Sequence, residues 1–221
     1  MNRNSIASIV ILIAVAAITA YALFGIDTKK PLRYFPYYGP STVNANKDTV
    51  FHTIRDFSFT DQANKNITQK DIEGKYVVVD YFFTTCHSIC PVMSTQMERI
   101  AAAYKGNKEV VILSHTVDPE TDSVEVMVEY AKKHSANNEQ WHFLTGDKKH
   151  LYNIARTSYF LDAAEGDGGP DDFIHTQNFV LVDKQKHIRG YYDGTSPQEV
   201  DKLITDIGLL MKEEKYNSEI K

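Results

Sequence analysis

The amino-acid sequence predicts an α/β domain in which helices flank a central mixed β-sheet, with a transmembrane helix at the N-terminus. Runs of β-branched and aromatic residues alternate with segments whose apolar residues recur every three or four positions, the pattern of strand–helix–strand units. Two late strands, Phe179–Asp183 and Ile188–Tyr192, are joined by a short link and are expected to form a β-hairpin. The third observation is an uncharged stretch over residues 6–26.

Residues 6–26 would just cross a membrane, because a rise of about 1.5 Å per residue covers a bilayer core of about 30 Å. The stretch is longer than the core of a signal peptide, so we expect residues 1–26 to be an uncleaved anchor. Residues 20–22, Ala-Tyr-Ala, resemble a cleavage site and leave a cleaved signal as the alternative. More basic residues follow the span than precede it, which by charge alone would place the domain inside the cell. The N-terminus lacks the character of a mitochondrial transit peptide, which favours a bacterial inner membrane.

The rest of the chain has the composition of a globular protein, with 43% hydrophobic and 24% charged residues. The net charge of −5 argues against a nucleic-acid partner, since such proteins present a basic face. We expect residues 27–52 to be a juxtamembrane linker, stiffened by the prolines and aromatic residues of residues 31–40. Residues 53–211 would form the folded domain, and residues 212–221 a charged tail.

The predicted elements follow one another as strand, helix, strand, helix, strand, helix, hairpin and helix. Alternation in Asp56–Asp61 predicts an edge strand, and the apolar run Tyr76–Phe83 predicts a buried strand. Pro91 suits the first turn of a helix, and Asp122 with Glu125 has the spacing of a capping box that opens the next helix. The remaining elements are expected at the strand Glu109–His115, the strand Trp141–Leu144, the helix Asp147–Arg156 and a last helix capped at Ser196–Glu199. A βαβ unit followed by a hairpin and a helix is the thioredoxin-like layout.

Both cysteines of the chain, Cys86 and Cys90, fall where the first core strand passes into its helix. The N–H groups and dipole of a helix N-terminus stabilise a thiolate, the form that attacks disulfides and binds metals. Four residues of helix rise by about 6 Å, within the Cα separation that a disulfide tolerates. The pair could therefore cycle between dithiol and disulfide or hold one soft metal ion. A purely structural bridge is disfavoured because so small a loop would stabilise little.

A histidine, His175, stands before the strand that should pass the cysteines. Redox enzymes of this fold usually have C-x-x-C and a cis-proline at that place, whereas here three residues separate the cysteines and Pro170 lies five residues before His175. Two thiolates and one imidazole suit copper, since thiolates favour Cu(I) and imidazole serves both oxidation states. A structural zinc site would usually have a fourth protein ligand.

Three segments resemble the Sco (SenC/PrrC) family of copper proteins. Thr84–Pro91, TTCHSICP, fits their C-x-x-x-C-P signature, and His115–Asp122, HTVDPETD, resembles their D-P-x-x-D segment. Phe173–Asp183, FIHTQNFVLVD, resembles the segment that carries their single histidine. Each motif is weak alone, but their order and spacing match across residues 53–210, and the N-terminal anchor matches too.

The resemblance implies a thioredoxin-like copper-binding domain on a single membrane anchor, facing the periplasm. Such proteins help to assemble the dinuclear copper centre of cytochrome c oxidase, so the copper-bearing oxidase subunit is the expected partner. A thioredoxin-like reductant or another copper donor would be a further partner. Carried over to this chain, Cys86 and Cys90 would be the sulfur ligands of copper and His175 the nitrogen ligand.

Asp118 and Asp122 would be supporting residues near the metal by the same resemblance. Each also has a local interpretation, because Asp118-Pro119 suits a turn and Asp122 suits a helix cap. His87 and Ser88 depart from the family, where many relatives have Pro and Asp. His87 could add a ligand or support the thiolates, or point to solvent.

Three functions follow, in order of preference. The first is a copper chaperone that uses Cys86, Cys90 and His175. The second is a thiol–disulfide reductase that keeps the copper-binding cysteines of the oxidase reduced, with Cys86 and Cys90 as its catalytic pair. The third is a redox or copper sensor. His175 separates the first two, since copper binding needs it and disulfide exchange does not.

Overall fold

A computed structural model describes residues 12–16, 19, 31–161 and 174–220 of the chain. Its contacts divide the chain into two compact units, one formed by Arg33–Lys212 and the other by Met1–Leu32 with Glu213–Lys221. Most of the expected membrane span, residues 6–26, lies outside the described residues. Among those that are described, no helix is both long enough and apolar enough to cross a bilayer.

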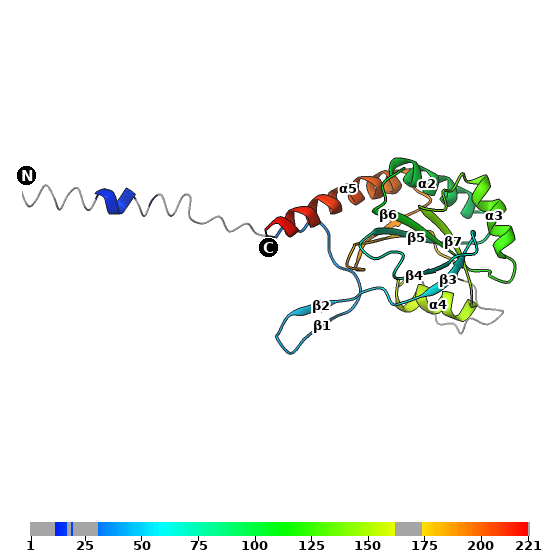
Figure 1. The fold of residues 1–221 in the computed structure, drawn as a ribbon, viewed down its shortest axis with the longest axis horizontal. Coiled ribbons are helices and arrows are strands. Elements are labelled where there is room, and N and C mark those ends of the chain that lie inside the picture. Colours follow the sequence, from blue (N-terminus) through cyan, green and yellow to red (C-terminus); the bar gives the residue numbers. More distant parts are fainter. Residues whose placement is uncertain (1–11, 17–18, 20–30, 162–173, 221) are drawn as a thin grey trace, which may run out of the picture. The chain divides into compact units, whose positions relative to one another are not determined.

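The unit Arg33–Lys212 contains a seven-stranded mixed sheet with the strand order β4-β3-β7-β6-β5-β8-β9 (Figure 1). Its strands are β3 (Ser58–Asp61), β4 (Asn66–Thr68), β5 (Tyr76–Phe82), β6 (Val110–Thr116), β7 (Trp141–Thr145), β8 (Asn178–Val182) and β9 (Ile188–Asp193). β6 is parallel to both β5 and β7, and the other pairs are antiparallel. All seven residues of β5 are buried, as expected for a valine-rich strand that is covered on both faces. The predicted α/β class with a mixed sheet is confirmed.

Four helices cover the two faces of this sheet. They are α2 (Cys90–Ala103), α3 (Val124–Lys133), α4 (Lys148–Thr157) and α5 (Pro197–Glu219). One apolar core contains residues of α2, α3 and α5, and a second core contains residues of α4. In Figure 1, α4 lies on the other side of the sheet from α2. Alternate residues of β5 enter the two cores, because successive side chains of a strand point to opposite faces.

The start of α3 differs from the prediction. Asp122 does not cap the helix; Ser123 is the N-cap, and its side chain accepts a hydrogen bond from the backbone N–H of Val126. The Ser123 hydroxyl donates to a carboxylate oxygen of Glu125 at 2.8 Å. Two neighbouring residues that both favour caps made the position ambiguous in the sequence, and this shift leaves the Asp122 carboxylate available for other contacts.

The segment before the predicted domain packs on the edge strand β9. The buried guanidinium of Arg189 donates to the carbonyl oxygens of Phe35 and Pro36, both at 3.1 Å, and pairs with Asp183 at 3.0 Å. The backbone N–H of Tyr38 donates to the carbonyl oxygen of Ile188 at 3.0 Å. The compact unit therefore begins at Arg33, ahead of the residue 53 expected from the sequence. A two-stranded sheet, β1 (Ser41–Val43) with β2 (Thr49–Phe51), follows this segment.

Candidate metal centre

The two cysteines lie on the connection between β5 and α2. β5 ends at Phe82, the backbone N–H of Cys86 donates to the carbonyl oxygen of Phe83 at 3.2 Å, and Cys90 is the first residue of α2. Pro91 occupies the first turn of α2, as predicted, and no side chain caps this helix. The first N–H groups of α2 are therefore not engaged by a capping side chain at the end of the helix that holds Cys90.

The thiols of Cys86 and Cys90 are both free and buried, but their acidities differ. Burial disfavours the Cys86 thiolate, yet hydrogen bonds from Cys90 and Ser88 outweigh this effect and lower the pKa of Cys86 to about 7. Burial raises the pKa of Cys90 to about 12, and the adjacent Cys86 adds to this increase. Cys86 is thus the sulfur that ionises first, and Cys90 retains its proton beside it.

Asp122 connects the cysteine loop to the end of β6. Its carboxylate is fully buried and accepts the backbone N–H of Thr84 at 3.2 and 3.3 Å, the hydroxyl of Thr84 and the hydroxyl of Thr116. Burial raises the pKa of Asp122 despite these hydrogen bonds, and Asp118 raises it further by charge repulsion. Asp122 thus contacts Thr84, two residues before Cys86.

Asp118 has the turn role that its sequence context suggested. Its carbonyl oxygen accepts the backbone N–H groups of Thr121 and Asp122 at 3.1 and 2.8 Å. Its own N–H donates to the hydroxyl of Thr116 at 2.9 Å. Thr116 therefore joins the Asp118 turn to the Asp122 carboxylate.

Asp80 is a buried acid that the sequence reasoning did not single out. It lies in the middle of β5 and accepts a hydrogen bond from the Ser114 hydroxyl, which itself accepts the indole N–H of Trp141 at 2.8 Å. Burial raises the pKa of Asp80 to about 7, and its negative charge contributes to the raised pKa of Cys90. The sequence feature that could have identified Asp80 is its position as the single acid in the otherwise apolar run YVVVDYFF. A carboxylate is rarely buried in such a run unless it has a hydrogen-bond partner or a function.

His175 lies in the segment that leads into β8, and its side chain is exposed. β8 pairs antiparallel with β5, with Val180 opposite Val79. Because the two strands are antiparallel, the segment before β8, which holds His175, enters the sheet at the end of β5 from which the cysteine loop leaves.

The predicted ligands do not form a closed cluster in this structure. Within residues 12–16, 19, 31–161 and 174–220, no three His, Cys, Asp or Glu side chains are placed to hold one metal ion. His87 is exposed, and Met93 is buried in the core on the α2 face. The assignment of copper to Cys86, Cys90 and His175 therefore remains a prediction.

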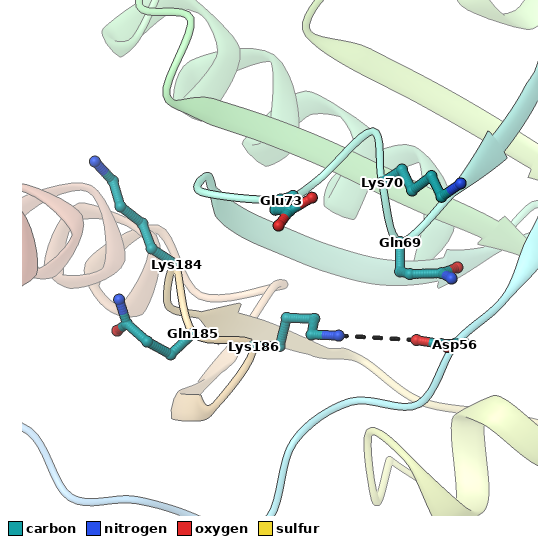
Figure 2. Close-up of a pocket in the computed structure, with 7 residues that line it drawn as sticks. All are labelled: Asp56, Gln69, Lys70, Glu73, Lys184, Gln185 and Lys186. Carbon is teal, nitrogen blue, oxygen red and sulfur yellow. Dashed lines mark ion pairs between the residues drawn. The ribbon is translucent and has the colours of Figure 1, made fainter.

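A cavity elsewhere on the surface offers no comparable chemistry. A pocket of about 290 Å³ lies between the segment before β5 and the β8–β9 turn. Figure 2 shows Lys186 directed at Asp56, with the ion pair at 3.7 Å, whereas Lys70 and Lys184 point away from one another. Lys184 pairs instead with Glu109. These lysines do not converge on a common ligand position, so the cysteine loop remains the stronger candidate site.

Known proteins resemble this chain in sequence and in fold. A family model described as SCO1/SenC matches residues 45–211. The SCO1 protein homolog of Bacillus subtilis is 28% identical over 162 residues, which cover 73% of this chain and 84% of that protein.

Two solved structures extend the similarity to three dimensions. BsSco, described as a Sco-family cytochrome c oxidase assembly protein with a disulfide switch, has a TM-score of 0.62 and 28% identity, covering 72% of this chain and 93% of that one. Arabidopsis thaliana ScoI, crystallised with copper bound, has a TM-score of 0.57 and 25% identity, covering 72% and 97%. The family model spans more than half of the chain, and the solved relatives share its fold. The chain therefore belongs to the SCO1/SenC family.

Proposed function

We propose that the protein is a copper chaperone that binds one copper ion through Cys86, Cys90 and His175 and supplies it to the copper centre of cytochrome c oxidase. The observation that carries the proposal is a free dithiol with one acidic thiol, next to a histidine segment aligned by the β5–β8 register. The copper-bound state of the Arabidopsis relative and the oxidase-assembly role of BsSco support the choice of metal and recipient.

Each ligand has a distinct part in taking up copper as a substrate. Cys86 is partly ionised near neutral pH and provides the first thiolate, and binding of the metal releases the proton of Cys90. The exposed His175 completes a set of two soft sulfurs and one imidazole, which suits copper. A site with few ligands near the surface can pass its ion to another thiolate site by ligand exchange.

The proposal also includes where the protein works. Residues 1–26 would be a single-pass anchor in a bacterial inner membrane, with the domain in the periplasm beside the copper-bearing subunit of the oxidase. The uncharged stretch over residues 6–26 is the support for this anchor. A thioredoxin-like reductant or a copper donor would keep the cysteines ready for another cycle.

Copper transfer tests this function. The full chain is loaded with one equivalent of Cu(I) without oxygen and mixed with the reduced, metal-free copper domain of an oxidase subunit II, and the two proteins are then separated by size. We expect copper to move to the acceptor from the wild type and from His150→Ala, a control histidine on α4. Copper that stays on the wild-type chain, or never binds it, would contradict the proposal.

A second function, thiol–disulfide reduction, is favoured by the different acidities of the two thiols. The Cys86 thiolate would attack an acceptor disulfide, forming a mixed disulfide and releasing one acceptor thiolate. Cys90, after losing its proton, would attack the Cys86 sulfur, closing the Cys86–Cys90 disulfide and releasing the second acceptor thiolate. Two electrons pass to the acceptor, and a thioredoxin-like reductant would restore the dithiol. Cys90→Ser should trap the mixed disulfide, and His175→Ala should leave the exchange rate unchanged.

A further inference from the structure

The Asp122 carboxylate is buried, and its hydrogen bonds reach the loop that carries Cys86. It lies in the connection between β6 and α3, far from Cys86 in the sequence, and it does not cap α3 because Ser123 has that role. A buried carboxylate without a local helix function is held at a desolvation cost, which its hydrogen-bond partners offset.

Those partners come from the cysteine loop and from the end of β6. Thr84 contributes both its backbone N–H and its hydroxyl, and Thr116 contributes its hydroxyl from the end of β6. Thr84 also lies inside the turn in which the N–H of Cys86 donates to the carbonyl oxygen of Phe83. A displacement of Thr84 therefore moves the backbone of Cys86 directly.

We propose that Asp122 is a positioning residue that fixes the turn of residues 83–86 against β6 and thereby sets the placement of Cys86 relative to Cys90. The inference rests on the cysteine pair being the functional group of the proposed function. It does not require copper, because the same placement governs the hydrogen bond from Cys90 to the Cys86 sulfur in the metal-free dithiol.

The contacts of Asp122 provide a matched pair of substitutions. Thr84→Val and Thr116→Val each remove one hydroxyl from the same carboxylate, but only Thr84 belongs to the cysteine loop. Thr84→Ser keeps the hydroxyl and should restore the wild-type behaviour. Asp122→Asn keeps the size of the side chain but replaces one of its two acceptor oxygens with an NH₂ donor. The amide therefore cannot accept all the hydrogen bonds that the carboxylate accepts.

The test measures the equilibrium constant between the Cys86–Cys90 dithiol and its disulfide in glutathione buffers, on the full metal-free chain. In Thr84→Val and Asp122→Asn, we expect the equilibrium constant to shift about tenfold towards the disulfide relative to the wild type. Thr116→Val should remain within about twofold of the wild type, although its urea midpoint falls. Thr84→Ser should match the wild type.

Two results would overturn the positioning role. One is a dithiol–disulfide equilibrium constant in Thr84→Val equal to that of the wild type. The other is an equal shift of this constant in Thr84→Val and Thr116→Val, which would mean that Asp122 only stabilises the fold. If Asp122→Asn does not fold, Thr84→Val decides the question, because it keeps Asp122 and the backbone hydrogen bond. Copper binding is measured separately, so a wild type that binds no copper would refute the chaperone while leaving this test intact.

Discussion

At the scale of single residues, the surroundings of Cys86 and Cys90 make two chemically identical thiols different. Hydrogen bonds from Cys90 and Ser88 stabilise the charge on Cys86, whereas burial and the neighbouring Cys86 and Asp80 oppose charge on Cys90. A pair in which one sulfur ionises first can begin either a metal uptake or a disulfide exchange at neutral pH.

This difference predicts a single thiolate titration near neutral pH. Because the pKa of Cys86 is lowered to about 7, its thiolate should appear as the pH rises through 7. At about pH 7, half of the chains should carry this thiolate. Ultraviolet thiolate absorbance of the reduced chain measures the step, and Cys86→Ser should abolish it. Two thiolates appearing together at the pH of an ordinary cysteine would show that the two environments are equivalent.

His115 in β6 predicts a separate dependence of stability on pH. Its ring is fully buried, stacks on Tyr81 with ring centroids 5.0 Å apart, and has both nitrogens without a hydrogen-bond partner in the described structure. Burial lowers the pKa of His115 from 6.5 to about 3, and nearby His150 lowers it further. The unfolded chain therefore binds this proton first, and stability should be lost as pH falls from about 6.5 towards 3.

The test compares free energies of unfolding in urea at pH 7 and pH 5. The wild type should lose about 2 kcal/mol more than His115→Phe over this interval, because each unit of pH contributes at most about 1.4 kcal/mol. His150→Phe is the matched control, since His150 packs on the same Phe59 ring as His115 but lies on α4. The same pH dependence in His115→Phe as in the wild type would contradict the account.

The sequence predicted some residues of the site and not others for a physical reason. The spacing of Cys86, Cys90 and His175 and the elements beside them indicate metal or redox chemistry. The roles of Asp80 and Asp122 depend on Ser114 and Thr116 of β6, which lies beside β5. Such contacts between neighbouring strands have no local signature, so the sequence left Asp122 with two interpretations, a helix cap and a supporting residue of the site.

At the scale of elements, periodic segments were predicted well and short ones were not. The strands β5 to β9 and the helices α2 to α4 have apolar patterns, and the predicted segments coincide with them to within a few residues. The last helix, α5, continues to Glu219, through most of the residues 212–221 that were expected to be a charged tail. The strands β1, β2 and β4 have three residues each, too few to show a period.

Residues 33–40 belong to the segment that was expected to be a linker. Their contacts with Arg189 could not be read from the local sequence. Their prolines and aromatic residues suit an extended chain, but the docking site is an arginine on β9, far along the sequence. The planar guanidinium donates to two carbonyl oxygens and one carboxylate and lies over the Tyr37 ring, 4.3 Å from its centroid.

Arg189→Lys should release this segment, because an ammonium group cannot reproduce the fork of donors. We expect a loss of about 2 kcal/mol in the free energy of unfolding and faster tryptic cleavage after the exposed Arg33. Limited digestion followed by mass spectrometry measures the cleavage, and Arg55→Lys, at an exposed position, is the control. Equal cleavage rates in the wild type and Arg189→Lys would show that Arg189 does not hold the segment.

At the scale of the whole molecule, the sheet brings together parts of the chain that are distant in sequence. The β5–α2 connection carries the cysteines, the β6–α3 connection carries Asp122, and the segment before β8 carries His175. The order β6-β5-β8 places these three segments at neighbouring strands. This arrangement places the residues of the proposed copper site at the same end of β5.

The most direct measurement of this central claim is a Cu(I) titration of the reduced full chain against a competing chelator, without oxygen. The variants are Cys86→Ser, Cys90→Ser and His175→Ala, with His150→Ala as the control. We predict one tightly bound copper in the wild type and in His150→Ala, and an affinity at least about tenfold lower in the other three, since each loses a ligand. Weak copper binding by the wild type, or a His175→Ala affinity equal to that of the wild type, would contradict the three-ligand site and leave a dithiol whose function is disulfide exchange.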